Sequence, residues 1–424
     1  MPKLPDGIKI ELDGREVDYI SAFLFNSRNN DDPKPLRANA GKSFQGSIVL
    51  GMGFTFDDRN PDATSLAEME RLIAQDPRNQ ERIFPYIGGE EVNSSPTHSH
   101  HRYVINFGEM SEAEARQWPD LMAIVEEKVK PARLKQNREI RKRYWWRFGE
   151  TTPALFKVIA ECDRVLVISR IGQHGSFTFL NSDFVFSESL VIFPLPNHKY
   201  FALLQSSIHE IWARFLGSSL EERLRYTPSD CFETFPFPEN HDTNPDLEAI
   251  GEHYYHYRAD LMVKNNQGLT DTYNRFHDPN ETHPDILQLR QLHQQLDTAT
   301  LTAYGWHDLT AAAYGFALDY LDLDDETRDQ LPTDQRQKID RHDLFFPDPH
   351  TAAIFDATIK TLSKTRKKLP WRYRWPDTLR NDLLARLLDL NRDRYDAEIR
   401  LGLHTKTKSK SKSKNTEGQQ ALDV

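Results

Sequence analysis

Three short patterns in the sequence carry side chains that could bind phosphate or a metal ion. In the first, Gly41, Lys42 and Ser43 have the order that ends a phosphate-binding loop. That loop also needs a glycine five positions before Gly41, where Leu36 stands. We therefore predict an ordinary turn here.

The second pattern has the residue types of a metal-dependent nuclease. Asp120 is followed by Glu126, Glu127 and Lys128. In such enzymes the carboxylates and the lysine converge from neighbouring strands to hold a divalent ion. Here they lie close together on one predicted helix, so we expect a solvated helix face and no nuclease site.

The third pattern is a histidine-rich loop. His98, His100 and His101 could bind a metal, but no acid or cysteine completes a set at ligand spacing. We predict a polar loop, which could touch phosphate. Amino-methylating DNA enzymes grip the target amine with a loop that contains two adjacent prolines, and this sequence has no such pair. We assign no catalytic, cofactor-binding or metal-binding residue.

A basic segment beside two tryptophans is more informative. Residues 128–147 hold nine Lys or Arg and a single acid, Glu139, although the whole chain has a formal net charge of -10. A helix that is merely solvated usually interleaves its charges. Uncompensated cations are expected where a polyanion neutralises them and releases counterions, and nearby aromatic rings add stacking. We favour nucleic acid over the alternative, a solvated amphipathic helix whose tryptophans fill a core. Residues 364–374 form a second cluster, with six cations and no acid.

Composition narrows the class of protein. A content of 28% charged and 38% hydrophobic residues is typical of a soluble globular protein with a core. No apolar run approaches the roughly 20 residues that span a membrane, and the N-terminus does not read as a secretory signal. Cys162 and Cys231 are the only cysteines, which excludes a disulfide framework and suits a reducing, cytoplasmic setting.

Helix signals bracket the basic segment. Ser111 and Glu114 form a capping box, which predicts a helix start near 111, and Pro119 and Pro131 should divide the helical region that follows. The last piece, residues 132–148, should be one cationic helix. In it Ile140, Tyr144 and Phe148 recur every four residues and predict a buried stripe.

Strand signals come next, before a mainly helical C-terminal part. Residues 47–56 read as a strand or strand pair, and β-branched and aromatic runs predict further strands at 164–170, 176–181, 184–187 and 189–195. Residues 199–217 have helical spacing with Gly217 as a stop, and residues 231–245 are rich in turn formers. Helical patterns then run from about 250 to 402, and the Lys/Ser tail reads as disordered.

These signals predict an α+β fold, with a mixed or antiparallel sheet and flanking helices followed by a mainly helical C-terminal domain. The predicted boundaries are 1–60, 61–242, 243–402 and 403–424. They correspond to an N-terminal segment, an α+β domain, a helical domain and a basic tail.

Several long runs resemble one family. The runs at 130–150, 163–193 and 208–238 resemble the target-recognition domain of MmeI-like restriction–modification enzymes of type IIL, within type IIG, and related phage-defence DNA methyltransferases. Residues 86–110 are similar to the stretch that leads into that domain, and residues 268–293 to the helical C-terminal domain.

The resemblance implies a role in sequence-specific recognition of double-stranded DNA. Family members carry an N-terminal methyltransferase domain, and this chain begins where that domain would end. The expected product is thus a detached specificity half, with a separate methyltransferase subunit as partner and no membrane. The family implies that this partner binds S-adenosylmethionine and methylates adenine N6, with the target base flipped out of the duplex. No cofactor is expected in this chain. The alternatives are a defence-complex scaffold that binds protein partners, a non-functional gene remnant, and an autonomous enzyme.

The resemblance also indicates candidate DNA-binding residues. The cations of the basic segment would grip the DNA backbone beside the target: Arg133, Lys135, Arg138, Arg141, Lys142, Arg143 and Arg147. Trp145 and Trp146 would pack or wedge against it. Those at strand ends and loops would lie near base edges: Arg170, Gln173, His174, Ser187, Glu188, Arg225, Ser229 and Asp230. The target sequence cannot be read from these residues.

Overall fold

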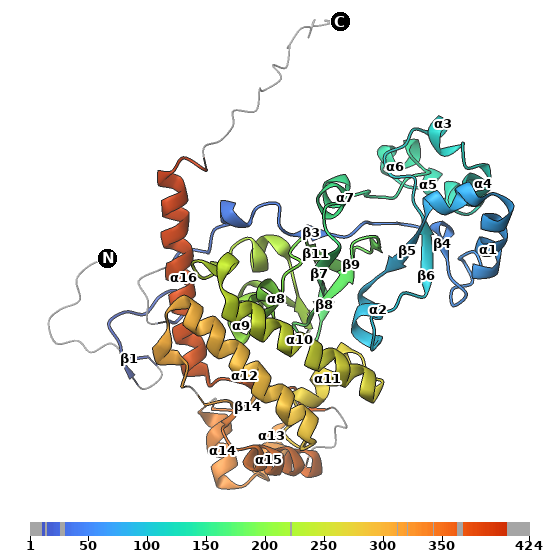
Figure 1. The fold of residues 1–424 in the computed structure, drawn as a ribbon. Helices are drawn as coiled ribbons and strands as arrows, with labels where there is room; N and C mark the ends of the chain where they lie inside the picture. Colours follow the sequence, from blue (N-terminus) through green and yellow to red (C-terminus); the bar gives the residue numbers. More distant parts are fainter. Residues whose placement is uncertain are drawn as a thin grey trace, which may run out of the picture.

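The computed structural model describes residues 11–12, 15–25, 30–220, 223–311, 313–319, 321–341, 343–362 and 368–404. The predicted Lys/Ser tail at 405–424 lies outside them. The fold is α+β, as predicted, with mostly antiparallel sheets among many helices. Figure 1 shows a central body, a lobe carrying α1 and α3–α6 to one side, and a smaller lobe carrying α13–α15 below. Within the described residues, no helix combines the length and apolar character needed to cross a bilayer.

The body is built on a four-stranded sheet of order β3-β11-β7-β9. Its strands are β3 (Phe44–Gln45), β7 (Arg164–Ser169), β9 (Phe177–Asn181) and β11 (Leu190–Phe193), all paired antiparallel. Most residues of β7, β9 and β11 are buried, so these strands read as continuous apolar runs. The sequence predicted β7, β9 and β11 correctly. The fourth predicted strand, β10 (Val185–Phe186), joins a different sheet.

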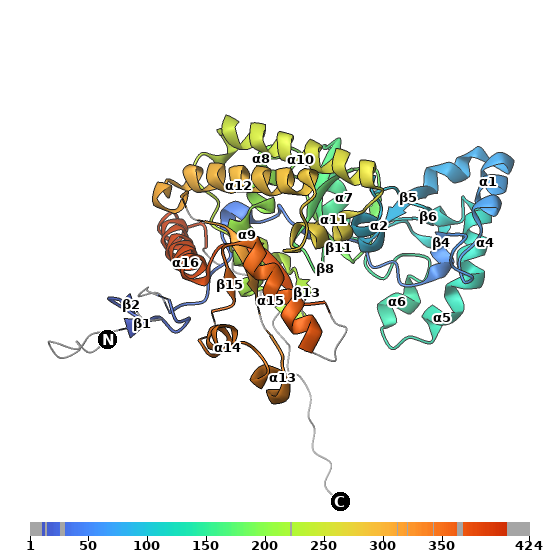
Figure 2. The ribbon, with the colours of Figure 1, turned by 90° about the horizontal axis from the view of Figure 1, so that it is seen from below.

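Helices pack around this sheet. They are α7 (Pro153–Ile159), α8 (His198–Gln205), α9 (Ser207–Leu216), α10 (Pro245–Asn265), α11 (Leu269–Phe276), α12 (Pro284–Tyr304) and α16 (Asp377–Arg400). Figure 2 shows α8, α10 and α12 side by side. The single helix predicted over 199–217 is wrong. Ser206 is extended (φ -65°, ψ 153°) and its side chain caps α9, while Gly217 ends α9 as expected.

One hydrophobic core joins elements on both sides of residue 242. It contains Phe201 and Trp212 together with Tyr254, Leu289 and Leu387. The contact between α8 and α10 depends on Gly251, because a Cβ there would lie 2.2 Å from the carbonyl oxygen of His198. The domain boundaries proposed from the sequence stay a prediction.

The N-terminal lobe has its own core and a sheet of order β10-β5-β6-β4. Besides β10, its elements are β4 (Thr55–Phe56), α1 (Leu66–Gln75), β5 (Ile83–Ile87), α2 (Gly89–Ser94), β6 (Arg102–Ile105), α3 (Glu112–Ala115), α4 (Pro119–Lys128), α5 (Lys130–Leu134) and α6 (Glu139–Arg143). The chain leaves the body at Ile48 and returns at Glu150. The amide of each residue donates to the carbonyl of the other, both at 3.1 Å.

Several local predictions in this lobe are confirmed. The Ser111–Glu114 capping box starts α3, and Pro119 begins α4. The predicted strand at 47–56 is confirmed only in part. Thr55–Phe56 is a strand, but Leu50 (φ 54°) and Gly51 (φ 143°) turn the chain between it and the isolated bridges at Ser47 and Ile48.

The single cationic helix expected over 132–148 is wrong. Helix α5 ends at Leu134 and α6 covers only Glu139–Arg143, so side chains four residues apart do not share one face. Ile140 is consequently 67% exposed, whereas Phe148 is buried.

The C-terminal part contains a small sheet that helical patterning did not predict. The strands β14 (Gly315–Leu318), β15 (Phe345–Phe346) and β16 (Trp371–Arg374) pair antiparallel in the order β15-β14-β16. They pack with α15 (Pro349–Leu362), and the shorter helices α13 (Asp325–Asp329) and α14 (Thr333–Asp340) lie nearby. Aromatic contacts among Phe346, Phe355 and Trp371 fill this lobe, and strands this short leave little periodicity to detect.

His209 should make the fold less stable in acid. Its side chain lies in the body core, and burial lowers its pKa to about 3, whereas an unfolded histidine titrates near 6.5. The unfolded state therefore takes up the proton first, and stability falls as the pH drops from about 6.5 towards 3. Between about pH 7 and 5 this histidine alone should cost about 2 kcal/mol of unfolding free energy, measured by urea titration.

The variant His209→Gln supplies the control. Glutamine can still reach the Tyr226 hydroxyl, which His209 Nε2 contacts at 2.9 Å, but it does not titrate. Between about pH 7 and 5, the unfolding free energy of His209→Gln should fall by about 2 kcal/mol less than that of the wild type. Parallel pH profiles for the two proteins would contradict this assignment.

Candidate nucleic-acid interface

A hollow of about 780 Å³ lies where the N-terminal lobe meets the body. Its charged side chains are Arg102, Arg170 and Arg225, with Glu90 and Glu188. The other lining residues are Gly89, Asn93, Ser94, Ile171, Ser189 and Thr270. The site thus combines three guanidinium groups with carboxylate, amide and hydroxyl groups, and both hydrogen-bond donors and acceptors face the same space.

Strand ends position two of the arginines. Arg170 follows β7, its amide donates to the carbonyl of Ser189 at 2.8 Å, and its Nη1 donates to the carbonyl of Glu188 at 3.2 Å. Arg225 ends β13 (Arg223–Arg225), the middle strand of a small sheet with β12 (Ser218–Leu220) and β8 (Ile171–Gly172). The amide of Tyr226 donates to the carbonyl of Arg170 at 2.8 Å, which fixes the two strand ends beside each other.

The third arginine is oriented by a buried carboxylate. Arg102 Nε and Nη2 donate to the two oxygens of Glu91 at 2.7 and 3.1 Å, and the guanidinium lies over the ring of Tyr86, 4.7 Å from its centroid. Glu91 also accepts a hydrogen bond from the amide of Gly88 at 3.0 Å, and it thereby caps the N-terminus of α2. This fork holds Arg102 in one direction.

Of the residues predicted near base edges, three meet in the hollow: Arg170, Glu188 and Arg225. Ser229 and Asp230 are exposed beyond β13 and hydrogen-bond to each other at 2.9 Å. Ser187 is buried.

Gln173 and His174 do not line the hollow. The carbonyl of Gln173 accepts from Arg214 and Arg372 at 3.0 and 2.9 Å. His174 is stacked on His277 and contacts the Arg372 guanidinium at 3.1 Å. Burial, with Arg372 nearby, lowers the pKa of His174 to about 3. Both residues therefore join the body to the C-terminal lobe.

The cationic segment divides into exposed and buried members. Lys135, Arg138 and Arg143 are exposed. Arg141 is half-buried, and Lys142 is half-buried and paired with Glu139 at 2.6 Å.

Three further predicted contacts of this segment, those of Arg133 and the two tryptophans, are corrected by burial, while Arg147 is partly buried and paired with an acid. Arg133 is 1% exposed, lies near the ring of Phe54 and donates to the carbonyls of Val49 and Arg147, so it cannot reach a DNA backbone in this structure. Burial removes water from the guanidinium, which destabilises its charged form and lowers the pKa of Arg133 to about 10.

The two tryptophans are core residues and do not wedge against a ligand. Trp145 and Trp146 are each 5% exposed, and Trp146 Nε1 donates to the carbonyl of Met110. Arg147 packs over the ring of Tyr144, donates to Met110 and pairs with Glu109 at 3.0 Å. The alternative reading, in which the tryptophans fill a core, is correct for this part.

The remaining sequence patterns are structural. Gly41 has φ 73° in a turn, as predicted. On α4, Glu126 pairs with Arg116 and Lys130, and Lys128 donates to the carbonyl of Ala63. Among the described residues, no group of three or more His, Cys, Asp or Glu is arranged to hold a metal.

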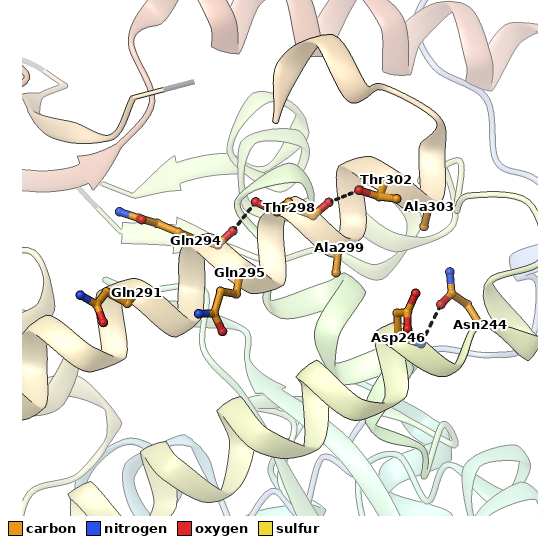
Figure 3. Close-up of a pocket in the computed structure, with 9 residues that line it drawn as sticks. All are labelled: Asn244, Asp246, Gln291, Gln294, Gln295, Thr298, Ala299, Thr302 and Ala303. Carbon is orange, nitrogen blue, oxygen red and sulfur yellow. Dashed lines mark hydrogen bonds between the residues drawn. The ribbon is translucent and has the colours of Figure 1, made fainter. Parts of the chain in front are cut away.

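Two other hollows have linings that are poorly suited to a polyanion. One, of about 580 Å³, separates the start of α10 from α12, where Figure 3 shows the side chains of Gln295 and Ala299 pointing toward the part of α10 that carries Asp246. Asp246 is the only charged residue of its lining.

The other hollow, of about 360 Å³, lies between α9, β16 and α16. Four arginines line it, but nearby carboxylates pair with them. Arg214 pairs with Glu210, and Arg374 and Arg380 pair with Asp377. Arg372 lies 3.7 Å from a carboxylate oxygen of Asp319.

Comparison with known proteins identifies the region that carries the first hollow. Residues 42–239 match the family model described as the MmeI target recognition domain. This segment is just under half of the chain, and we call it the MmeI-type domain for its similarity to that family model. Every lining residue of the hollow except Thr270 lies inside the MmeI-type domain.

A solved structure is also similar. It is that of the type IIL restriction-modification enzyme MmeI in complex with DNA, at 18% sequence identity and a TM-score of 0.49. The match covers 80% of this chain, and the chain spans 39% of the length of that one. None of the curated proteins matches.

Sequence reasoning missed Arg102 and the α2 residues Glu90 and Asn93. Arg102 directly follows the histidine loop, which was expected only to be polar. The orientation of the Arg102 side chain depends on Glu91, eleven positions earlier, and on the packing of α2 against the body. The one available signal was a cation at the start of a strand.

Glu91→Gln should lower the free energy of unfolding by about 2 kcal/mol, because Arg102 then faces a neutral partner in a largely buried pair. The neighbouring Glu90→Gln removes the same charge from an exposed position and should change stability by less than about 0.5 kcal/mol. Urea unfolding measures both. Equal losses would show that Glu91 has no special role in holding Arg102.

Proposed function

We propose that this chain recognises a specific sequence of double-stranded DNA. The observation that carries the proposal is the meeting of Arg102, Arg170 and Arg225 at one hollow of the MmeI-type domain. They come from three separate elements, and Glu188 stands beside them. A purely electrostatic surface would not need this mixture of fixed donors and acceptors.

The chemistry of the hollow suits base edges in the major groove. An arginine fork can donate to O6 and N7 of guanine, an asparagine such as Asn93 can pair with adenine, and a carboxylate such as Glu188 can accept from N4 of cytosine.

Backbone contacts fall to the exposed cations of the N-terminal lobe. Lys135, Arg138 and Arg143 extend into solvent, and Arg141 and Lys142 are partly accessible. Contacts of this kind give affinity and orientation without sequence choice.

We further propose that recognition serves an S-adenosylmethionine-dependent adenine-N6 methyltransferase of a restriction–modification or phage-defence system, acting in the cytoplasm. The catalytic domain would be supplied by a separate subunit or by a region outside this sequence. The support is the family resemblance of residues 130–150, 163–193 and 208–238. The target base would be flipped from the duplex into that catalytic domain.

Replacing Arg141, Lys142 and Arg143 together with alanine should weaken binding to every duplex. Each phosphate contact contributes about 0.9 to the slope of log affinity against log salt, so the slope should flatten by up to about 3. Mobility-shift titrations at several salt concentrations measure it.

A charge-matched control is the triple alanine variant of Arg386, Arg392 and Arg400 on α16, across the body from α5 and α6 (Figure 1). It should retain the wild-type salt slope. An unchanged affinity in the first triple variant, or binding of a protein partner that ignores salt, would favour the scaffold alternative.

Arg225→Ala should act differently, by relaxing sequence choice. Loss of one bidentate base contact removes about 1–3 kcal/mol of discrimination at a single base pair. Competition between the preferred duplex and single-base variants would detect this, with Arg143→Ala as the contrasting backbone variant. Uniform weakening by both variants would remove Arg225 from the reading surface.

A further inference from the structure

The hollow contains one aliphatic side chain in an otherwise polar lining. Ile171 lies on β8 and is 45% exposed. It directly follows Arg170 in the chain, and both residues belong to the same lining. An isoleucine at such a place adds apolar surface to water unless a partner covers it.

Strand register fixes which way Ile171 points. It pairs directly with Arg225 in the antiparallel ladder between β8 and β13, so the two side chains emerge on the same face. The preceding pair, Gly172 with Leu224, faces the other way, and Leu224 is buried. One face of the ribbon therefore packs on the body, while the other presents an isoleucine beside an arginine.

Base edges in the major groove offer one apolar group. This is the C5-methyl of thymine, or of a methylated cytosine, and it projects into the groove beside the hydrogen-bonding atoms of the base edge. We propose that Ile171 is a specificity-determining residue that reads the C5-methyl group of a thymine in the bound DNA. This inference rests on the proposed function and adds a defined chemical feature to the target.

The geometry distinguishes Ile171 from other exposed aliphatic residues. Ile354 is similarly exposed, at 48%, but it lies on α15 in the C-terminal lobe, outside the hollow. It provides a control of the same residue type. Ile171→Val keeps a branched apolar surface, and Ile171→Ala removes most of it.

The experiment begins with the full chain. Duplexes selected from a random-sequence library define the preferred site, and each thymine in it is then replaced singly by deoxyuridine. This exchange removes only the methyl group and leaves the pairing edge intact. At one thymine, deoxyuridine should weaken binding about fourfold, the factor expected for one buried CH₂-sized group.

The protein variants assign that effect to a residue. Ile171→Ala should bind the thymine and deoxyuridine duplexes equally, whereas Ile171→Val and Ile354→Ala should retain the difference. At the same position, 5-methylcytosine should bind better than cytosine by a similar factor in the wild type and not in Ile171→Ala. This last pair separates methyl reading from recognition of thymine as a base.

The outcomes that overturn the inference are distinct from those that overturn the function. A clear preferred site in which every thymine tolerates deoxyuridine, or which has no thymine, overturns methyl reading alone. A deoxyuridine effect that persists in Ile171→Ala assigns the methyl to another residue and also overturns it. Selection that recovers no preferred site overturns sequence recognition, and the inference with it.

Discussion

Two main-chain hydrogen bonds at Arg170 hold three distant stretches of chain together. Its amide donates to Ser189, and its carbonyl accepts from Tyr226, each at 2.8 Å. The end of β7, the turn before β11 and the end of β13 thus meet at one residue. Because backbone groups make these bonds, side chains can vary around them while the positions of their Cα atoms stay fixed. The hollow, the positions of Arg170 and Arg225, and the exposed face of the β8–β13 ladder all depend on this junction.

Charge in this protein is distributed by burial more than by sequence position. The basic segment looked uniform in the sequence, yet the fold buries Arg133 against backbone carbonyls and pairs Arg147 with Glu109. Only the middle of the segment remains available. A buried cation is costly unless carbonyls or acids surround it, so its neighbours are arranged to satisfy it. The segment therefore serves the lobe's own packing as well as any partner.

Strands and helix caps could be predicted because their causes are local. The apolar runs of β7, β9 and β11 and the capping box at Ser111 are readable within a few residues. The break at Ser206 and the split of the basic helix were missed. Next to these breaks, the amide of Ser207 donates to Asp297 and Arg133 donates to the carbonyl of Val49, and both partners lie far along the chain. The same distinction between local and distant causes decides which residues of the site could be predicted. Arg170, Glu188 and Arg225 sit at predicted strand ends, whereas Arg102 depends on the buried carboxylate of Glu91, for which no sequence spacing exists.

The bridge between Ile48 and Glu150 makes the N-terminal lobe a closed excursion from the body. The chain returns to the point from which it left, and the excursion carries one wall of the hollow, with α2 and Arg102, while β8 and β13 remain behind as the other wall. The excursion is nevertheless tied to the body, because β10 joins its sheet and the amide of Gly89 donates to Ser189 Oγ at 2.9 Å. The two walls are therefore coupled, and a change in the backbone of one wall shifts the side chains of the other.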